Sequence, residues 1–392
     1  MRVLMLSWEF PPRGTGGVAA QVAGLGSALA AAGHDVVVLT VADRPAELNA
    51  RPPDGVRVLR TLVDLPWLPP VETVTRVASA NHSVTRLGVR LHDDLEGWEP
   101  EIVHGHDWQL GWAADSLAAR YEVPFVLTMH GTERVRHGGQ LPLGHPTDIN
   151  SIEWWLAFEA QRLIAPTRFI VEQLITGFEL DLDHVVHIPN GIDPMSWRPA
   201  GRTTTSEGPR PPLVVSWGRV RYEKGFQVLA RAMHELRGRV PDVHAVIAGR
   251  GSYLPELQTQ IDVEGVSDIV DLAGFLGDTD LRALVHRSGC VVIPSLYEPF
   301  GIVALEALAA GAPLIVARTG GLAELVAGTH AGVTFEPGNP DDLADAVEQV
   351  LSNDELAAIL VANARDLVER KYAWSAIARR TADVYSAVIA DR

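Results

Sequence analysis

Short apolar runs alternate with longer amphipathic stretches along the whole chain of 392 residues. Each apolar run is rich in Val, Leu and Ile and is five to seven residues long, which is typical of strands buried on both faces. The predicted strands cover residues 2–7, 35–40, 56–60, 101–106, 124–130 and 184–189 in a first series, and 212–218, 244–249, 268–274, 289–295, 312–317 and 331–336 in a second. Helical periodicity between them, as in 17–33 and 224–239, predicts helices on both faces of parallel sheets.

The break between the two series is compositional. Residues 194–212 are rich in Pro, Gly, Ser, Thr and Arg and have no hydrophobic periodicity, as expected of a linker. We therefore expect an α/β fold with two doubly wound domains, 1–193 and 213–371, joined by that linker. Ligands of such sheets bind beyond the carboxyl ends of the strands, so two domains that face each other would form a binding cleft.

The composition is that of an ordinary globular protein and excludes several classes. A formal net charge of −16 disfavours a general nucleic-acid binder. No apolar run reaches the ~18 residues of a membrane-spanning helix, and the apolar N-terminal run is too short for a secretory signal. A single cysteine, Cys290, leaves no internal disulfide and suits the reducing cytoplasm, which is the expected location.

Two cations follow the first strand of the second domain. Arg219 and Lys224 lie in WGRVRYEKGF and would project from the carboxyl end of that strand. A guanidinium fork and an ammonium group together suit a diphosphate, although two solvated loop cations are the alternative interpretation. Lys224 and Lys371 are the only lysines among 33 basic residues, which indicates that position 224 needs this side chain.

Glycines follow the first strand of the first domain. Gly14, Gly16 and Gly17 stand before a predicted helix, where backbone amides could meet a phosphate or simply form a tight turn. Their spacing breaks the G-x-G-x-x-G pattern of a dinucleotide site, so a nicotinamide cofactor is not supported.

Two further strands of the first domain end in polar residues. VHGHDWQLG carries His104, His106 and Asp107, and TMHGTERVRHGG carries His130. Adjacent parallel strands would bring these groups to one rim of the sheet. The further ligands of a metal site are missing nearby, and the Asp-x-Asp sequences elsewhere do not follow an apolar strand, so we expect no metal.

One segment of the second series resembles a known family. Residues 298–325, EPFGIVALEALAAGAPLIVARTGGLAEL, resemble the donor-site segment of the retaining family-4 glycosyltransferases, in which two glutamates eight positions apart flank a Phe-Gly. These enzymes have the GT-B fold of two Rossmann-like domains facing a cleft. In the first domain, HGHDW and HGTERVRHGG look closest to the starch and glycogen synthase branch, including bacterial α-1,4-glucan synthases. The similarity covers essentially the whole chain, but GTGG, with Thr15, stands where longer starch and glycogen synthases have KTGG.

The resemblance implies roles for residues of the second domain. Glu306 would hold the ribose hydroxyls of a nucleotide, and Glu298 would lie near the anomeric side of the sugar and its hydroxyls. Arg219 and Lys224 would stabilise the departing diphosphate. The groups that would meet the nucleotide, the phosphates or the sugar are at Arg250, Gly251, Phe300, Gly301 and Ile302.

The resemblance also implies roles in the first domain. Gly16 and Gly17 would lie near the diphosphate, His130 near the transferred sugar and Asp107 on the acceptor side. The last segment, residues 372–392, would be a helix that returns to the first domain. The partners implied are a nucleoside diphosphate sugar and a saccharide acceptor, and no cofactor is required because the donor is itself a substrate.

The resulting hypothesis is a retaining hexosyltransferase that moves glucose from ADP-glucose or UDP-glucose to an α-1,4-glucan or a related saccharide. A family-4 transferase for mannose or N-acetylglucosamine is the first alternative. A GT-B sugar-nucleotide epimerase is a weaker one, because the helix with two glutamates argues against it. A glucan phosphorylase would need a pyridoxal lysine, for which Lys371 is badly placed, and a non-enzymatic glycan binder would not need a diphosphate site.

Overall fold

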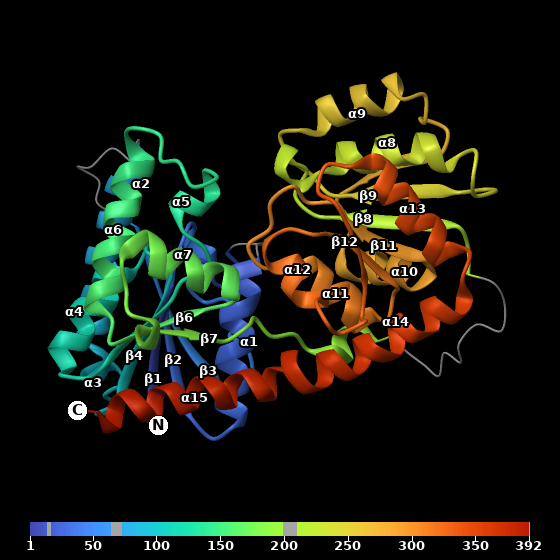
Figure 1. Ribbon diagram of the computed structural model, residues 1–392. Helices are drawn as coiled ribbons and strands as arrows, with labels where there is room; N and C mark the ends of the chain where they lie inside the picture. Colours follow the sequence, from blue (N-terminus) through green and yellow to red (C-terminus); the bar gives the residue numbers. More distant parts are fainter. Residues whose placement is uncertain (14–16, 64–72, 199–209, 392) are drawn as a thin grey trace. The chain divides into compact units, whose positions relative to one another are not determined.

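The computed structural model describes residues 1–13, 17–63, 73–198 and 210–391 (Figure 1). The chain divides into two compact units. Unit 1 consists of Met1–Gly191 and Trp374–Arg392, and unit 2 consists of Ile192–Ala373. Each unit is built around a parallel sheet with helices on both faces, as the alternation of apolar runs and amphipathic stretches predicts.

Unit 1 contains a seven-stranded sheet in the order β3-β2-β1-β4-β5-β6-β7. Its strands are β1 (Arg2–Ser7), β2 (Asp35–Ala42), β3 (Val56–Leu62), β4 (Ile102–His106), β5 (Phe125–Thr128), β6 (Arg162–Ala165) and β7 (Val185–His187). The strand order reverses at β1, which pairs with β2 on one side and β4 on the other. Ligands of doubly wound sheets bind at such a switch point. Among the described strands of this sheet, β6 is not predicted, because it has four residues and follows a helix almost at once.

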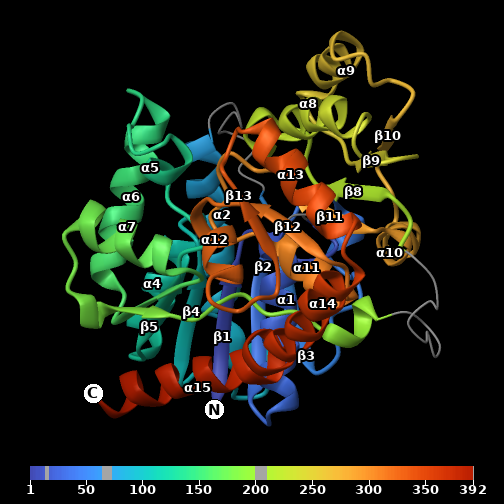
Figure 2. The same cartoon turned by 45° about the vertical axis from the view of Figure 1, so that its right-hand side comes forward.

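Helices cover both faces of the unit 1 sheet (Figures 1 and 2). On one face, α1 (Gly17–Ala31) packs against α15 (Trp374–Ala390), and on the other, α2 (Thr73–Gly88) packs against α4 (Gly111–Tyr121). Alternate side chains of β1 point to opposite faces of the sheet. Val3 and Met5 point to the same face and pack in one core with Tyr385 of α15. The remaining helical segments are α3 (Leu91–Asp94), α5 (Glu133–Arg136), α6 (His145–Glu159), α7 (Arg168–Phe178) and the 3₁₀ turns Pro45–Glu47 and Leu182–His184.

The C-terminal helix α15 is held in unit 1 by close packing and by hydrogen bonds. Gly24 of α1 lets the indole of Trp374 lie against the helix, since a Cβ at position 24 would come within 2.2 Å of Trp374 Cζ2. Arg380 donates to the carbonyl of His187 at 2.5 Å. Residues from the far end of the chain therefore complete the core that β1 begins.

Unit 2 contains a six-stranded sheet in the order β10-β9-β8-β11-β12-β13. Its strands are β8 (Leu213–Trp217), β9 (His244–Ala248), β10 (Val270–Gly274), β11 (Cys290–Ile293), β12 (Leu314–Ala317) and β13 (Val333–Phe335). Each lies within a predicted range, because each is a short, mostly apolar run between turn residues. The strand order reverses at β8, between β9 and β11, so the carboxyl end of β8 is the expected ligand position.

The helices of unit 2 form two apolar cores with the sheet. α8 (Phe226–Leu236), α9 (Leu254–Val263) and α13 (Pro340–Leu351) cover one face. α10 (Asp278–Arg287), α11 (Ile302–Ala310), α12 (Gly320–Val326) and the end of α14 (Asp354–Leu367) cover the other, and the π-helical turn Val368–Tyr372 follows α14. In neither unit is a described helix long and apolar enough to cross a membrane.

The edges of unit 2 differ from the predicted linker and domain boundary. Pro194–Trp197, at the start of the predicted linker, form a 3₁₀ turn in unit 2, where Trp197 is buried and stacks on Trp217 with ring centroids 6.1 Å apart. Residues 199–209 of that linker lie outside the described residues. At the other edge, unit 2 runs to Ala373 and α15 begins at Trp374, two residues beyond the predicted start at 372.

Candidate functional site

The carboxyl ends of β8 and β11 bring a cation and a carboxylate together in unit 2. Lys224 Nζ lies 2.5 Å from Glu298 Oε2, and Ser295 Oγ donates to the same oxygen at 3.2 Å. The two charged side chains are 27% and 12% exposed, so the pair is largely shielded from solvent. The N–H of Leu296 donates to the carbonyl of Glu223 at 2.8 Å, which joins the two loops that carry the pair.

Arg219 lies in the same loop as Lys224 but projects into solvent. Its guanidinium makes no hydrogen bond or ion pair with the residues that the structure describes, whereas the nearby Arg221 lies 4.0 Å from Glu223. The loop after β8 therefore presents Lys224, which a carboxylate holds in place, and Arg219, which is available to a ligand.

The N-terminus of α11 lies directly after Glu298. Gly301 precedes this helix with a φ of 95°, and a Cβ at position 301 would come within 2.4 Å of Leu322 Cδ2, so the turn requires glycine. No side chain of the described residues caps α11, which leaves the amide of Ile302 and those that follow without a side-chain acceptor. An uncapped helix N-terminus beside a lysine favours an anion.

The loop that carries Glu298 is fixed on both sides. The N–H of Gly321, in the first turn of α12, donates to the carbonyl of Glu298 at 3.0 Å. Phe300 is buried and meets Tyr372 edge-on, with ring centroids 6.5 Å apart. The backbone between the two glutamates is therefore held in place by neighbouring elements.

Glu306 lies two turns into α11 and meets the end of β8. Its Oε2 accepts a hydrogen bond from Trp217 Nε1 at 3.1 Å. Burial raises the pKa of Glu306 to about 7, against the opposing effect of the Trp217 hydrogen bond. The carboxyl group therefore changes its charge near neutral pH and has hydrogen-bonding capacity left for a ligand.

Two residues near Glu306 are not among the predicted site residues. The guanidinium of Arg282 lies 5.4 Å from the ring centroid of Trp197, which itself stacks on Trp217. Arg282 Nε is buried and has no hydrogen-bond partner among the described residues. In the sequence, only the presence of Trp197 in an otherwise polar stretch could have indicated this cluster.

Arg250 and Gly251 lie in the loop after β9, next to the loop after β8. The N–H of Val220 donates to the carbonyl of Arg250 at 2.9 Å. The Arg250 guanidinium lies 5.5 Å from the ring centroid of Phe275, which follows β10 and is 61% exposed. The structure thus brings these predicted residues to the same edge of the sheet as the two cations.

In unit 1, the carboxyl ends of β4 and β5 meet at Asp107 and His130. The N–H of His130 donates to Asp107 Oδ1 at 2.8 Å, and the N–H of Asp107 donates to the carbonyl of Thr128 at 2.8 Å. Asp107 has a φ of 56°, a left-handed conformation that aspartate adopts more readily than most residues. Asp107 is buried and His130 is half-buried, so the two predicted residues form one small cluster at this rim.

His104 lies inside the unit instead. Its Nδ1 is 2.6 Å from the hydroxyl of Tyr385, and its Nε2 is 2.7 Å from Thr128 Oγ1. Burial lowers the pKa of His104 to about 3, so the ring is neutral. Both ring nitrogens are occupied within the fold. In the part of the chain that the structure describes, no three His, Cys, Asp or Glu side chains are grouped so as to hold a metal ion.

A buried carboxyl group lies behind the rim of unit 1. Glu153 of α6 is 0% exposed, and its two oxygens accept the N–H of Glu133 at 3.1 and 2.9 Å. Burial raises the pKa of Glu153 to about 8. The hydrogen bond from the Glu133 N–H and the charge of Arg136 oppose this rise, whereas the charges of Asp107 and Glu133 add to it. Arg136 also donates to Glu133 Oε2 at 2.8 Å. The sequence does not reveal Glu153, because a glutamate in a helix normally lies on the exposed face.

The glycine loop after β1 is only partly described. Gly17 is the first residue of α1 and is half-buried, whereas Gly16 lies outside the described residues. The first turn of α1 holds no acidic side chain, so the positive end of the helix dipole is not neutralised there.

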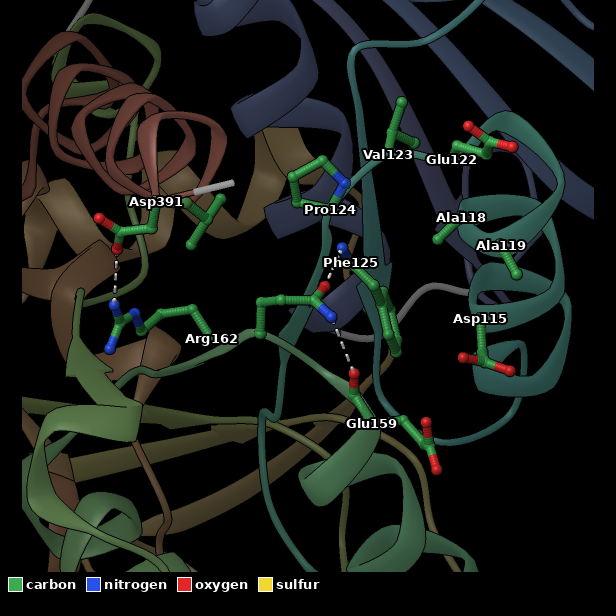
Figure 3. Close-up of a pocket in the computed structure, with 12 residues that line it drawn as sticks. Asp115, Ala118, Ala119, Glu122, Val123, Pro124, Phe125, Glu159, Arg162 and Asp391 are labelled. Carbon is green, nitrogen blue, oxygen red and sulfur yellow. Dashed lines mark hydrogen bonds and ion pairs between the residues drawn. The ribbon is translucent and has the colours of Figure 1, made fainter.

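A pocket of about 540 Å³ lies at the opposite end of the unit 1 sheet (Figure 3). It is lined by residues at the start of β5 and β6, at the end of α4 and just after α15, among them Phe125, Arg162 and Asp391. Arg162 Nη2 lies 3.8 Å from Asp391 Oδ2. No predicted site residue lines this pocket, which is separate from the rim at the carboxyl ends of the strands.

Comparisons with known proteins agree with this arrangement. Residues 15–195 match the family described as Glycosyltransferase Family 4, and residues 202–367 match the family described as Glycosyl transferases group 1. The chain is 36% identical to glycogen synthase of Mycobacterium tuberculosis, over 99% of this chain and 95% of that protein. It is 28% identical to α-maltose-1-phosphate synthase of the same organism, over 100% of both.

A solved structure shows the same fold over the whole length. Sucrose-phosphate synthase from Thermosynechococcus elongatus is similar with a TM-score of 0.82 and 22% sequence identity, and the similarity covers 100% of each chain. The resemblance found in the sequence and the predicted pair of Rossmann-like domains are therefore confirmed. The chain belongs to the group 1 and family 4 glycosyltransferases, with the GT-B fold.

Proposed function

We propose that the protein transfers glucose from ADP-glucose or UDP-glucose to an α-1,4-glucan or a related saccharide, with retention of the α configuration. The supporting observation is the group formed by Lys224, Glu298 and the uncapped N-terminus of α11 in unit 2. An ammonium group and a helix N-terminus attract a diphosphate, while the adjacent carboxylate can accept hydrogen bonds from sugar hydroxyls. The guanidinium of Arg219 adds a second cation in the loop after β8.

The donor is held along this rim in the proposed complex. Glu306 accepts hydrogen bonds from the ribose hydroxyls, and Arg250 and Gly251 lie beside the nucleotide. Backbone amides from Phe300 to Ile302 meet the phosphates or the sugar. The side chain of Glu306 supports this role because Trp217 occupies only one of its oxygens in the structure.

The barrier of the reaction is the breaking of the bond between the anomeric carbon and the diphosphate oxygen. The bonding electrons pass to the diphosphate, and positive charge develops on the sugar ring. Lys224, Arg219 and the helix N-terminus stabilise the negative charge, and one well-placed group of this kind contributes about 3 kcal/mol. The acceptor hydroxyl attacks the same face of the sugar and its proton passes to the departing phosphate, so the proposed reaction needs no enzyme nucleophile and no cofactor.

Unit 1 supplies the groups for the transferred sugar and the acceptor in this proposal. His130 contacts the transferred sugar and Asp107 contacts the acceptor. The hydrogen bond of 2.8 Å between the His130 backbone and the Asp107 carboxylate supports a joint role, because it fixes the two residues relative to each other.

The choice of glucose and of a glucan rests on similarity to glycogen synthase, which exceeds 30% identity over nearly the whole chain. Similarity to α-maltose-1-phosphate synthase favours a second candidate acceptor, a glucose that carries a phosphate. Both candidates use the same donor chemistry, so they differ only in what the acceptor side must bind.

A matrix of donors and acceptors tests the proposal. ADP-glucose, UDP-glucose, UDP-N-acetylglucosamine and GDP-mannose are each combined with maltooligosaccharides, glycogen, glucose 1-phosphate or water, and nucleotide release is measured. We expect release with a glucose donor and a maltooligosaccharide, and an α-linked product in the proton NMR spectrum. A product from mannose or N-acetylglucosamine alone, or a β-linked product, would overturn the assignment.

Controls separate true transfer from hydrolysis or contamination. Lys224→Ala should abolish most of the release, whereas Arg221→Ala, which removes an exposed cation of the same loop, should not. If both variants behave like the wild type, the release does not come from the site described above.

A further inference from the structure

Three histidine rings form a column that runs from the interior of unit 1 to its rim. His104 and His106 lie two residues apart on β4 and therefore on the same face of the sheet, and their ring centroids are 4.2 Å apart. His130, just beyond β5, stacks on His106 with ring centroids 5.7 Å apart and planes inclined by 19°. His106 Nδ1 lies 3.4 Å from His130 Nε2. His106 thus stands between a structural histidine and the one predicted to meet the substrate.

His104 limits what His106 can do on its inner side. Both nitrogens of His104 are engaged, with Tyr385 and with Thr128, so His104 offers His106 ring contact and no hydrogen bond. His106 is 3% exposed, and burial lowers its pKa well below the usual value, so it is neutral and carries one ring proton.

The position of that proton follows from the partners of the two nitrogens. His106 Nε2 is buried and has no hydrogen-bond partner among the described residues, whereas Nδ1 faces His130 Nε2. Buried N–H groups without an acceptor are rarer than acceptors without a donor. The proton of His106 therefore lies on Nδ1, and His130 Nε2 is the acceptor.

We propose that His106 is a positioning residue whose Nδ1–H donates to His130 Nε2. Because His130 Nε2 accepts this bond, the ring proton of His130 lies on Nδ1, and this N–H donates to a hydroxyl oxygen of the transferred sugar. Which nitrogen of His130 carries the proton decides whether the ring donates to the substrate or accepts from it. The sugar contact rests on the proposed function, whereas the protonation pattern of the two rings does not.

The test combines NMR spectroscopy with kinetics. In protein labelled with ¹⁵N-histidine, two-bond ¹⁵N–¹H correlations report the protonated nitrogen of each ring, and the spectra of His106→Asn and His130→Asn identify the two signals among the 14 histidines. We expect His106 and His130 both protonated on Nδ1. A wild-type His130 protonated on Nε2 overturns the proposal, whatever the kinetics of the variants.

Two substitutions then distinguish positioning from packing. His106→Leu fills the space without a donor, and we expect kcat to fall about tenfold with an unchanged KM for the donor and a mixed protonation of His130. His106→Asn places an amide N–H where Nδ1–H was, and we expect it to restore the Nδ1 form of His130 and most of kcat. The proposal is overturned if His106→Leu has the kcat of the wild type. It is also overturned if kcat falls equally in His106→Leu and His106→Asn.

The outcome for the sugar contact is separate. If His130→Ala transfers glucose at the wild-type rate, the role of His130 in the proposed function is wrong, and with it the donation to the sugar. The NMR result then still reports the hydrogen bond between the two rings. If the matrix of donors and acceptors shows no transfer at all, the proposed function is wrong, whatever the NMR result and the rate of His130→Ala.

Discussion

The two rims at the carboxyl ends of the strands are built from opposite kinds of polar group. In unit 2, Lys224 and Glu298 form an ion pair that is partly open to solvent, and Arg219 is exposed beside it. In unit 1, His104 and His106 are buried and neutral, and the pKa of Glu153 is raised so that this carboxyl group keeps its proton at neutral pH. The unit 2 rim therefore presents a cation pair with a carboxylate, whereas the Asp107 and His130 cluster of unit 1 is backed by buried, uncharged groups.

This difference follows from what each rim is proposed to bind. A diphosphate is anionic, and cations on the surface can approach it without first losing the solvation that a buried charge would have to give up. Sugar hydroxyls are neutral, and neutral donors and acceptors can be buried beside them as long as each finds a partner. Substitutions in unit 2 should therefore act on the donor and on charge, and substitutions in unit 1 on the acceptor and on stability.

The largest effect is expected for Lys224→Ala. It removes the cation that would stabilise the leaving group, and it leaves Glu298 without its ion-pair partner at 2.5 Å. We expect kcat to fall about 100-fold to 1,000-fold in a nucleotide-release assay. Arg221→Ala is the matched control, with less than about a twofold change. A loss of similar size in Arg221→Ala would mean that general charge, and not the position of Lys224, is what matters.

A smaller effect is expected for Glu306→Gln. The amide can still accept the hydrogen bond from Trp217 Nε1 but loses acceptor capacity for ribose hydroxyls. We expect ADP or UDP to bind about tenfold more weakly by calorimetry. Because the pKa of Glu306 is about 7, nucleotide affinity of the wild type should rise as the pH increases through 7 and the carboxylate forms, and that of the variant should not. Identical pH profiles would contradict the assignment of Glu306.

Asp107→Asn tests the other rim. The asparagine oxygen can still accept the N–H of His130, so the local fold should persist. We expect KM for a maltooligosaccharide to rise about threefold, since a charged acceptor is replaced by a neutral one, with no change in KM for the donor. An increase in the KM for the donor alone would reverse the division of roles between the units.

The last prediction concerns stability and not binding or catalysis, and it is made for Glu153→Gln. The pKa of Glu153 is raised from 4.5 to about 8, so its protonated form stabilises the folded state fully below pH 4.5, and this contribution is lost as the pH rises to about 8. Relative to Glu153→Gln, the free energy of unfolding of the wild type should fall by about 1 kcal/mol per pH unit over that range. Urea unfolding at several pH values measures the difference, and parallel curves for the two proteins would show that Glu153 does not titrate in this way.

The central strands of both units are predictable because a strand buried on both faces must be an apolar run. The partly exposed edge strands β10 and β13 are found because they still carry apolar residues between turn residues. Polar residues after such runs can be placed at a rim from the geometry of parallel sheets alone, which is why Lys224, Asp107 and His130 are found from the sequence. β6 is missed because four residues after a helix give too short a pattern.

The partners of the site residues are not predictable in the same way. Trp197 lies in a stretch rich in Pro and Arg, yet it is buried beside Trp217, and Glu153 lies on a helix with no strong apolar face, yet it is fully buried. Both depend on contacts between residues far apart in the chain. Periodicity describes only neighbours in sequence, so it cannot reveal such burial.

The packing of α15 has a consequence for synthesis of the chain on the ribosome. Unit 2 is one continuous stretch, Ile192–Ala373, whereas unit 1 needs Trp374 against Gly24 and Tyr385 against His104. Residues that are synthesised before unit 2 therefore belong to a unit that is completed only after unit 2. A nascent chain that has not yet released α15 exposes the apolar face that α1 and β1 present to it, and such exposed surface favours aggregation until α15 packs.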